Sequence, residues 1–160
     1  MEIKNIVKLF CILILFVMAC SLYVEEKKEI DSILSEISAI NNKTDVEKFK
    51  GYKNKINELE EKFKDVSNAE LKEKLSKLQS LFQDKLAAKL AALKAAKQKI
   101  GNITEADNSK AKMSIWAESK LVGVTIKFLG NIASGKGQEM SKDAVEQIDK
   151  IIKFLEEGTN

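Results

Sequence analysis

Apolar residues recur at steps of three and four through most of the chain after Tyr23, which is the period of an amphipathic helix. The pattern predicts a first helix up to Ile40, a second over Val46–Val66, and a longest helix over residues 69–100. At 1.5 Å per residue the longest helix would extend about 48 Å, which is long for a globular domain. An antiparallel hairpin with the second helix is the simplest way to cover its apolar stripe, and a break near its alanine-rich part is the alternative. That stripe contains Leu71, Leu75, Leu78, Phe82, Leu86, Leu90, Leu93 and Ile100.

Capping signals indicate where these helices begin and end. Thr44 and Glu47 have the spacing of a capping box, in which a hydroxyl and a carboxylate satisfy free N–H groups at a helix start. Ser67 and Glu70 repeat that spacing before the longest helix. Gly101 is expected to be the C-cap of that helix because glycine tolerates the backbone conformation that ends one.

The last third of the chain predicts two more helices. After a polar loop over residues 102–109, a fourth helix is expected over Lys110–Leu129. Its second half is apolar on nearly all sides, which indicates a buried central helix, and a short strand is the alternative because Val, Thr and Ile cluster there. A glycine-containing loop follows over residues 130–137, and Ser141 is expected to cap a last helix that ends at Gly158. The inward positions of that helix are expected to be Val145, Ile148, Ile152 and Leu155.

The first twenty residues have the features of a bacterial lipoprotein signal peptide. Lys4 and Lys8 form a positive n-region, and Leu9–Met18 is an uncharged apolar run that suits the h-region. This run is too short to span a bilayer, which needs about 20 apolar residues. Val17–Cys20 is similar to a lipobox and therefore predicts cleavage before Cys20 and lipidation of that cysteine.

The chain is thus expected to have three regions: a cleaved signal peptide over residues 1–19, a lipidated cysteine with a short tether over residues 20–26, and a single helical domain over residues 27–160. An uncleaved membrane anchor or a buried N-terminal helix is the alternative for the first region. The domain is expected to be an all-α, antiparallel bundle of about five helices. Because Cys11 would leave with the signal peptide and Cys20 would carry lipid, no intramolecular disulfide is expected.

Composition excludes several classes of function. All 27 basic residues are lysines, 24 residues are acidic, and the formal net charge is +3 with no histidine. Without histidine there is no Ser-His-Asp triad, no Cys-His pair and no zinc site of the usual nitrogen-and-sulfur kind. Without arginine there is no bidentate fork for phosphate or guanine, and the net charge is too small to indicate nucleic-acid binding. We therefore expect no catalytic residue, no cofactor and no nucleic-acid partner.

Two short patterns resemble binding motifs but are interpreted otherwise. Asp143, Glu146 and Asp149 are spaced by three, yet they lack the loop of an EF-hand, so a polar helix face is preferred over a calcium site. The segment from Gly130 to Gly137 follows the spacing of a phosphate-binding loop until its last position. There Gly137 replaces the Ser or Thr that would bind magnesium, so a flexible loop is expected.

Two features could contact a protein partner. Trp116 is the only tryptophan and is expected to be partly buried in the core, with a binding anchor as the alternative because tryptophan is enriched at interface hot spots. Five lysines of the longest helix form what we call the lysine strip. A solvated face is the preferred interpretation of this strip, and a patch for an acidic partner is the alternative. The strip comprises Lys85, Lys89, Lys94, Lys97 and Lys99.

Several segments, taken in order, resemble the Rev family of surface lipoproteins of Lyme-disease spirochaetes (Borrelia). The likeness covers essentially the whole chain, and its specificity comes from the combination and order of segments that are individually ordinary lysine-rich helix. The segments are Phe16–Cys20, Tyr23–Asp31, Asn68–Leu75, Phe82–Lys97 and Ala144–Asn160.

This resemblance implies an adhesin of the bacterial outer membrane that binds host fibronectin and is not an enzyme. It assigns no binding residues to this chain, because the resemblance supplies no short binding motif that could be carried over residue by residue. The alternative function is a surface lipoprotein that binds another host serum protein, such as a complement regulator, or that associates with itself.

Overall fold

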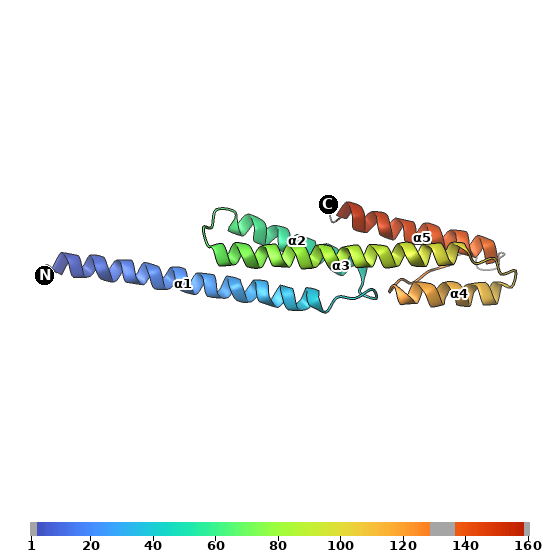
Figure 1. The fold of residues 1–160 in the computed structure, drawn as a ribbon, viewed down its shortest axis with the longest axis horizontal. Coiled ribbons are helices and arrows are strands. Elements are labelled where there is room, and N and C mark those ends of the chain that lie inside the picture. Colours follow the sequence, from blue (N-terminus) through green and yellow to red (C-terminus); the bar gives the residue numbers. More distant parts are fainter. Residues whose placement is uncertain (1–2, 129–136, 159–160) are drawn as a thin grey trace.

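The computed structural model describes residues 3–128 and 137–158, and the regular structure in these ranges is entirely helical. The helix α3 runs along the middle of an elongated bundle and contacts each of the other four helices (Figure 1). The predicted all-α fold with one long helix is therefore confirmed, and α3 continues through its alanine-rich part. The elements are α1 (Ile3–Ser38), α2 (Val46–Phe63), α3 (Ala69–Gly101), α4 (Asn108–Leu121) and α5 (Gly137–Gly158).

The bundle consists of two three-helix halves that share α3. The helices α1 and α2 pack along the N-terminal half of α3, and α4 and α5 pack along its C-terminal half (Figure 1). The predicted antiparallel hairpin of α2 and α3 is confirmed. Near the middle of the bundle α2 also meets α5, where the Lys50 ammonium lies 5.4 Å from the centre of the Phe154 ring. The length of α3 is thus explained by one continuous core that extends through both halves.

The capping residues of α2 and α3 lie one position later than the sequence predicts. Asp45, not Thr44, is the N-cap of α2, and its carboxylate accepts a hydrogen bond from the Glu47 N–H at 2.9 Å. Asn68, not Ser67, is the N-cap of α3, and its side-chain oxygen accepts from the Leu71 N–H at 3.1 Å. Asp and Asn cap helices at least as well as Ser and Thr, so sequence alone does not separate neighbouring candidates.

The long helix ends one residue later than expected. Gly101 is the last residue of α3, and Asn102 is the C-cap. The backbone N–H of Asn102 donates to the Gln98 carbonyl, so the helical hydrogen bonding continues past the glycine.

The fourth helix is much shorter than the predicted Lys110–Leu129. It ends at Leu121 because Gly123 adopts a left-handed conformation with φ of 63°. The Gly123 N–H donates to the Lys120 carbonyl and the Val124 N–H donates to the Ser119 carbonyl, which is the Schellman pattern of helix termination. The glycine was visible in the sequence, but the apolar run around it obscured its role.

Beyond Gly123 the chain is neither the buried helix nor the strand that the sequence suggested. Val124 and Ile126 are buried while Thr125 and Lys127 are exposed, so side chains alternate as they do in an extended chain. The backbone of Lys127 pairs with the side-chain amide of Gln147 on α5, through bonds of 3.1 and 2.9 Å. The Gln147 side-chain amide thus supplies the donor and the acceptor that the backbone of a neighbouring strand would supply.

The last helix begins at Gly137, four residues before the predicted cap Ser141. Ser141 is buried, and its hydroxyl donates to the Ile100 carbonyl at the end of α3. It therefore joins two helices instead of capping one. Of the predicted inward positions, Ile148, Ile152 and Leu155 are buried and Val145 is half-buried. Apart from Gly137, the predicted loop over 130–137 lies outside the described residues.

The N-terminal part of α1 projects beyond the bundle (Figure 1). The described apolar side chains in this part are exposed, and Glu26 is the first buried residue along the described chain. The described side chains that precede Glu26 therefore take no part in the core. No helix in the described part of the chain is long and apolar enough to cross a membrane. The exposed side chains are Phe10, Ile12, Leu13, Ile14 and Val24.

Replacing Gly123 with alanine should destabilise the protein by more than about 2 kcal/mol. Alanine is strained in the left-handed backbone conformation, and its Cβ would clash with the backbone of Lys43. A Cβ at this position would lie 2.2 Å from the Lys43 carbonyl oxygen. The matched control is Gly51→Ala in the middle of α2, where a Cβ meets nothing within 4 Å. That change should stabilise by about 0.5–1 kcal/mol because glycine is a poor helix former. Urea denaturation followed by circular dichroism measures both, and equal stability of the two variants would contradict the role given to Gly123.

Candidate functional site

The lysine strip is not a free basic surface. Three of its members pair with acids on α4 or α5, and the other two donate to backbone carbonyls. The strip is therefore neither a solvated face throughout nor an unpaired patch, because it lies where α3 meets its neighbours. Sequence spacing could not show these partners, which lie far along the chain. The three ion pairs are Lys94–Glu156 at 2.9 Å, Lys97–Asp149 at 2.6 Å and Lys99–Glu118 at 3.2 Å.

Lys89 is buried at the junction of the two halves, with 1% of its surface exposed. Its ammonium donates to the carbonyls of Asn42 at 2.7 Å, Thr44 at 2.9 Å and Val122 at 2.7 Å. An ammonium has three N–H groups, so each one has an acceptor. Burial lowers the pKa of Lys89, and the nearby Asp45 carboxylate opposes that shift. A residue that sequence analysis placed on a surface strip thus ties the α1–α2 loop to the end of α4.

Lys85 acts in a similar way one turn earlier on α3. Its ammonium donates to the carbonyls of Ser38 and Ile40, each at 2.9 Å. Ser38 is the last residue of α1, where carbonyl groups lack partners within the helix and attract cations. The two lysines therefore satisfy carbonyls that follow α1 and α4.

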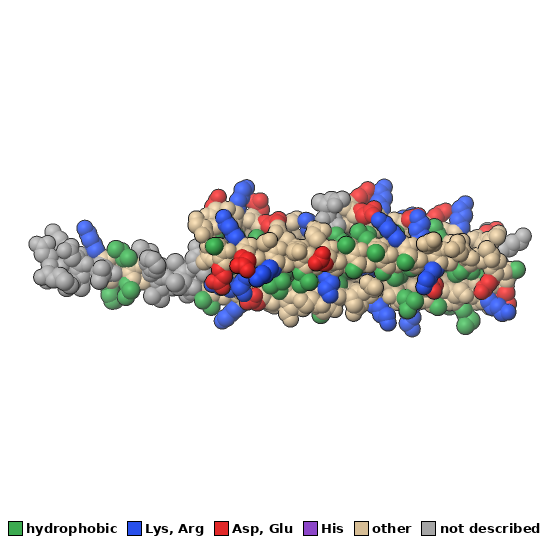
Figure 2. Space-filling view, in the orientation of Figure 1, with side chains coloured by type: hydrophobic (Ala, Val, Ile, Leu, Met, Phe, Trp, Pro, Cys, Tyr) green, Lys and Arg blue, Asp and Glu red, His purple; other side chains and the backbone are tan. Residues whose placement is uncertain are grey.

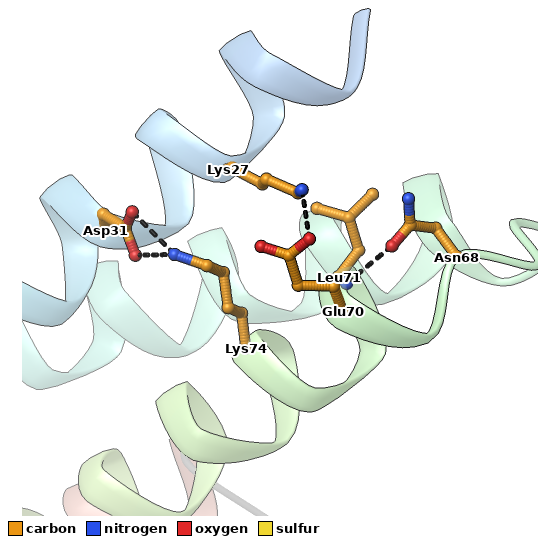
Figure 3. A network of polar contacts seen from close by, with 6 residues as sticks. All are labelled: Lys27, Asp31, Asn68, Glu70, Leu71 and Lys74. Carbon is orange, nitrogen blue, oxygen red and sulfur yellow. Dashed lines mark hydrogen bonds and ion pairs between the residues drawn. The ribbon is translucent and has the colours of Figure 1, made fainter. Parts of the chain in front are cut away.

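A second set of polar contacts joins the start of α3 to α1 (Figure 3). Lys27 pairs with Glu70, and Lys74 contacts both carboxylate oxygens of Asp31 at 2.5 and 2.7 Å. Figure 2 shows acidic and basic side chains gathered in this part of the bundle. These contacts lie just after the predicted tether over residues 20–26, which follows the predicted lipid attachment at Cys20. The Cys20 side chain lies outside the described residues.

The acids of α5 do not form a metal site. Asp143 accepts a hydrogen bond from the Gln147 amide at 2.7 Å, and Asp149 is paired with Lys97. Among the described residues no group of three or more His, Cys, Asp or Glu side chains could hold a metal ion. The interpretation of Asp143, Glu146 and Asp149 as a polar helix face is consistent with this arrangement.

A groove of about 660 Å³ lies between α3 and α5. The ion pairs Lys94–Glu156 and Lys97–Asp149 lie along it, above Ile152. Because each of these lysines faces an acid, the groove presents no charge of a single sign. Its two carboxylates, Asp149 and Glu156, are each paired with a lysine.

Trp116 lies on the outer face of α4 and is not a core residue, since 46% of its surface is exposed. Its indole N–H donates to the Ile126 carbonyl at 3.4 Å, and the Lys112 ammonium lies 4.7 Å from the ring centre. A pocket of about 380 Å³ opens between the ring and the extended segment. Trp116 is thus an exposed aromatic side chain that borders a concave surface. The pocket is lined by Trp116, Ser119, Lys120, Val124, Thr125 and Ile126.

Comparison with known proteins identifies what the chain is similar to. Residues 1–157 match the family model described as Borrelia burgdorferi REV protein. A crystal structure of a Rev protein from Borrelia burgdorferi is 64% identical in sequence and superposes with a TM-score of 0.75. That match covers 84% of this chain and 97% of the Rev chain, so a chain shorter than this one forms the same fold. A search of curated proteins gives no match.

Replacing Lys89 with methionine should lower the free energy of unfolding by about 2–4 kcal/mol, because three carbonyls at the junction lose the donor that they share. The matched control is Lys94→Met, which removes an exposed ion pair worth at most about 1 kcal/mol. Urea denaturation of both variants measures the difference. Equal losses would show that Lys89 does not hold the junction.

Proposed function

Because this chain belongs to the Borrelia REV protein family, we propose that it is a lipid-anchored adhesin of the bacterial outer surface that binds host fibronectin and catalyses no reaction. The observation that carries the proposal is the family match over residues 1–157, which includes the lipobox-like Val17–Cys20 as well as the helical domain. The lipid anchor and fibronectin are what the sequence resemblance implies.

The arrangement of the bundle supports binding through helix surfaces. Within residues 3–128 and 137–158 there is no sheet, so no open strand edge is available in that part for strand addition. Docking would therefore use side chains on the outer faces of helices. In protein–protein interfaces a few residues contribute most of the binding free energy, and the contacts around them contribute little.

The domain without its predicted anchor, residues 21–160, should bind immobilised fibronectin at about micromolar concentration. Biolayer interferometry measures this binding at low and high salt, and exposed charges are screened beyond about 10 Å at 0.1 M salt. Albumin on a matched sensor is the control. No response to fibronectin at either salt would refute the proposed ligand.

Incubating the immobilised domain with serum distinguishes fibronectin binding from the alternative function. Capture of a complement regulator by immobilised domain, with no capture of fibronectin, would favour binding of another host protein. Sedimentation velocity of the domain alone tests self-association.

Lipidation should depend on Cys20 and not on Cys11. In the bacterium, Cys20→Ala should abolish incorporation of labelled palmitate and partitioning into Triton X-114, because it removes the thiol that the lipid would occupy. Cys11→Ala is the matched control, since Cys11 would be discarded with the signal peptide. Unchanged detergent partitioning of the Cys20 variant would overturn the lipoprotein assignment.

A further inference from the structure

Positive charge outweighs negative charge on α4 and the segment that follows it. Residues 108–128 contain four lysines and a single acid, Glu118. Glu118 is already paired with Lys99 on α3. Within the described residues none of the four lysines has an acidic partner, whereas most members of the lysine strip are neutralised or buried. The four are Lys110, Lys112, Lys120 and Lys127.

Exposed apolar surface is concentrated on the same helix. Among the described residues that follow Val24 in sequence, every exposed large hydrophobic side chain lies on α4. They are Met113, Trp116 and Leu121, with 70%, 46% and 55% of their surface exposed. Met113 and Trp116 are three residues apart and therefore lie on one face of α4. Apolar side chains grouped on one face mark an interaction site more often than scattered ones do.

The pocket beside Trp116 is already formed. Its floor consists of the buried residues Ser119, Val124 and Ile126, and its rim carries Lys120. The indole N–H bond to the Ile126 carbonyl fixes the orientation of the ring. A partner would therefore not have to order this aromatic side chain on binding, which reduces the entropic cost of association.

We propose that this surface, which we call the α4 face, docks an acidic segment of a protein partner. An apolar side chain of the segment enters the Trp116 pocket, and flanking carboxylates pair with Lys112 and Lys120. The α4 face comprises Lys112, Met113, Trp116, Lys120 and Thr125. The inference rests on the proposed adhesin function, for which it supplies the contact surface and the chemistry of the matching site on fibronectin.

Two other occupants fit the surface less well. In a symmetric contact between two copies, the unpaired lysines of α4 would face each other and repel. A membrane is disfavoured by position, since α4 lies at the opposite end of the bundle from the N-terminus of α1 (Figure 1). An acidic protein segment satisfies both the charge and the location.

The single tryptophan makes the test direct, because residues 21–160 contain one indole N–H and hence one indole resonance. The first probe is a peptide with one phenylalanine between aspartate and glutamate residues, with a lysine-substituted peptide as its control. The second probe is fibronectin, measured by biolayer interferometry. The domain begins before the first buried residue, and the shorter Rev chain has the same fold, so the domain is expected to fold on its own.

The variants are Trp116→Ala, Trp116→Phe and Lys120→Glu. The matched control is Lys72→Glu, an exposed lysine at the start of α3 and far from α4. Circular dichroism and thermal unfolding of each variant check the fold, and Lys120 is exposed, so its substitution should leave the fold intact. We expect Trp116→Ala and Lys120→Glu to weaken fibronectin binding at least about tenfold, with Trp116→Phe intermediate and Lys72→Glu unchanged. The acidic peptide should shift the indole resonance of the unmodified domain.

The outcomes separate the two proposals. Fibronectin binding that is equal in all variants would leave the adhesin function standing and overturn the α4 face. A peptide-induced indole shift that Lys120→Glu abolishes, without fibronectin binding, would support the α4 face and refute fibronectin as its ligand. No response to either probe would overturn both. An indole shift that depends on protein concentration alone, or that requires anionic vesicles, would overturn the acidic partner in favour of a second copy or a membrane.

Discussion

The buried ammonium of Lys89 is the contact on which the arrangement of the two halves depends. It binds carbonyls from the α1–α2 loop and from the end of α4, which are segments about eighty residues apart in sequence. Burying a lysine is unfavourable unless every donor is satisfied, and here each one is. The left-handed Gly123 places the α4 end against Lys43 of the same loop. The two three-helix halves thus meet at the Lys89 ammonium. The helix α3 belongs to both halves and must therefore extend through both.

The distribution of ion pairs follows from that architecture. Lysines of α3 find acids on the helices that flank it, and the start of α3 is held to α1 by Lys27–Glu70 and Asp31–Lys74. Individually such exposed pairs contribute little to stability. The pairs made by Lys94, Lys97 and Lys99 neutralise charge along α3. The outer face of α4 combines lysines that have no acidic partner among the described residues with apolar side chains in water, and the proposed docking of an acidic segment rests on this combination.

Much of the fold could be predicted because a helix is encoded by the spacing of apolar residues within one short segment. The steps of three and four located all five described helices, and the apolar stripe of α3 was recognised over nearly its whole length. Errors occurred where several residues could do the same task. Thr44 and Asp45 are both capable caps, and the apolar run from Val122 to Phe128 suits a buried helix as well as an extended segment. For the segment after Gly123 the deciding contact is with α5, where Gln147 pairs with the backbone of Lys127.

The sequence by itself determined the helical class, the long central helix, the likeness to a lipoprotein family and the absence of histidine-based chemistry, since these depend on residue identity and short spacing. Only the tertiary structure decided which charges remain free. Lys89 and Lys120 look alike in sequence, but one is enclosed by carbonyls from three distant positions and the other borders an open pocket. The same holds for Trp116, whose exposure depends on where the extended segment returns along α4. Contacts between residues far apart in sequence determine burial and charge pairing, and no local pattern records them.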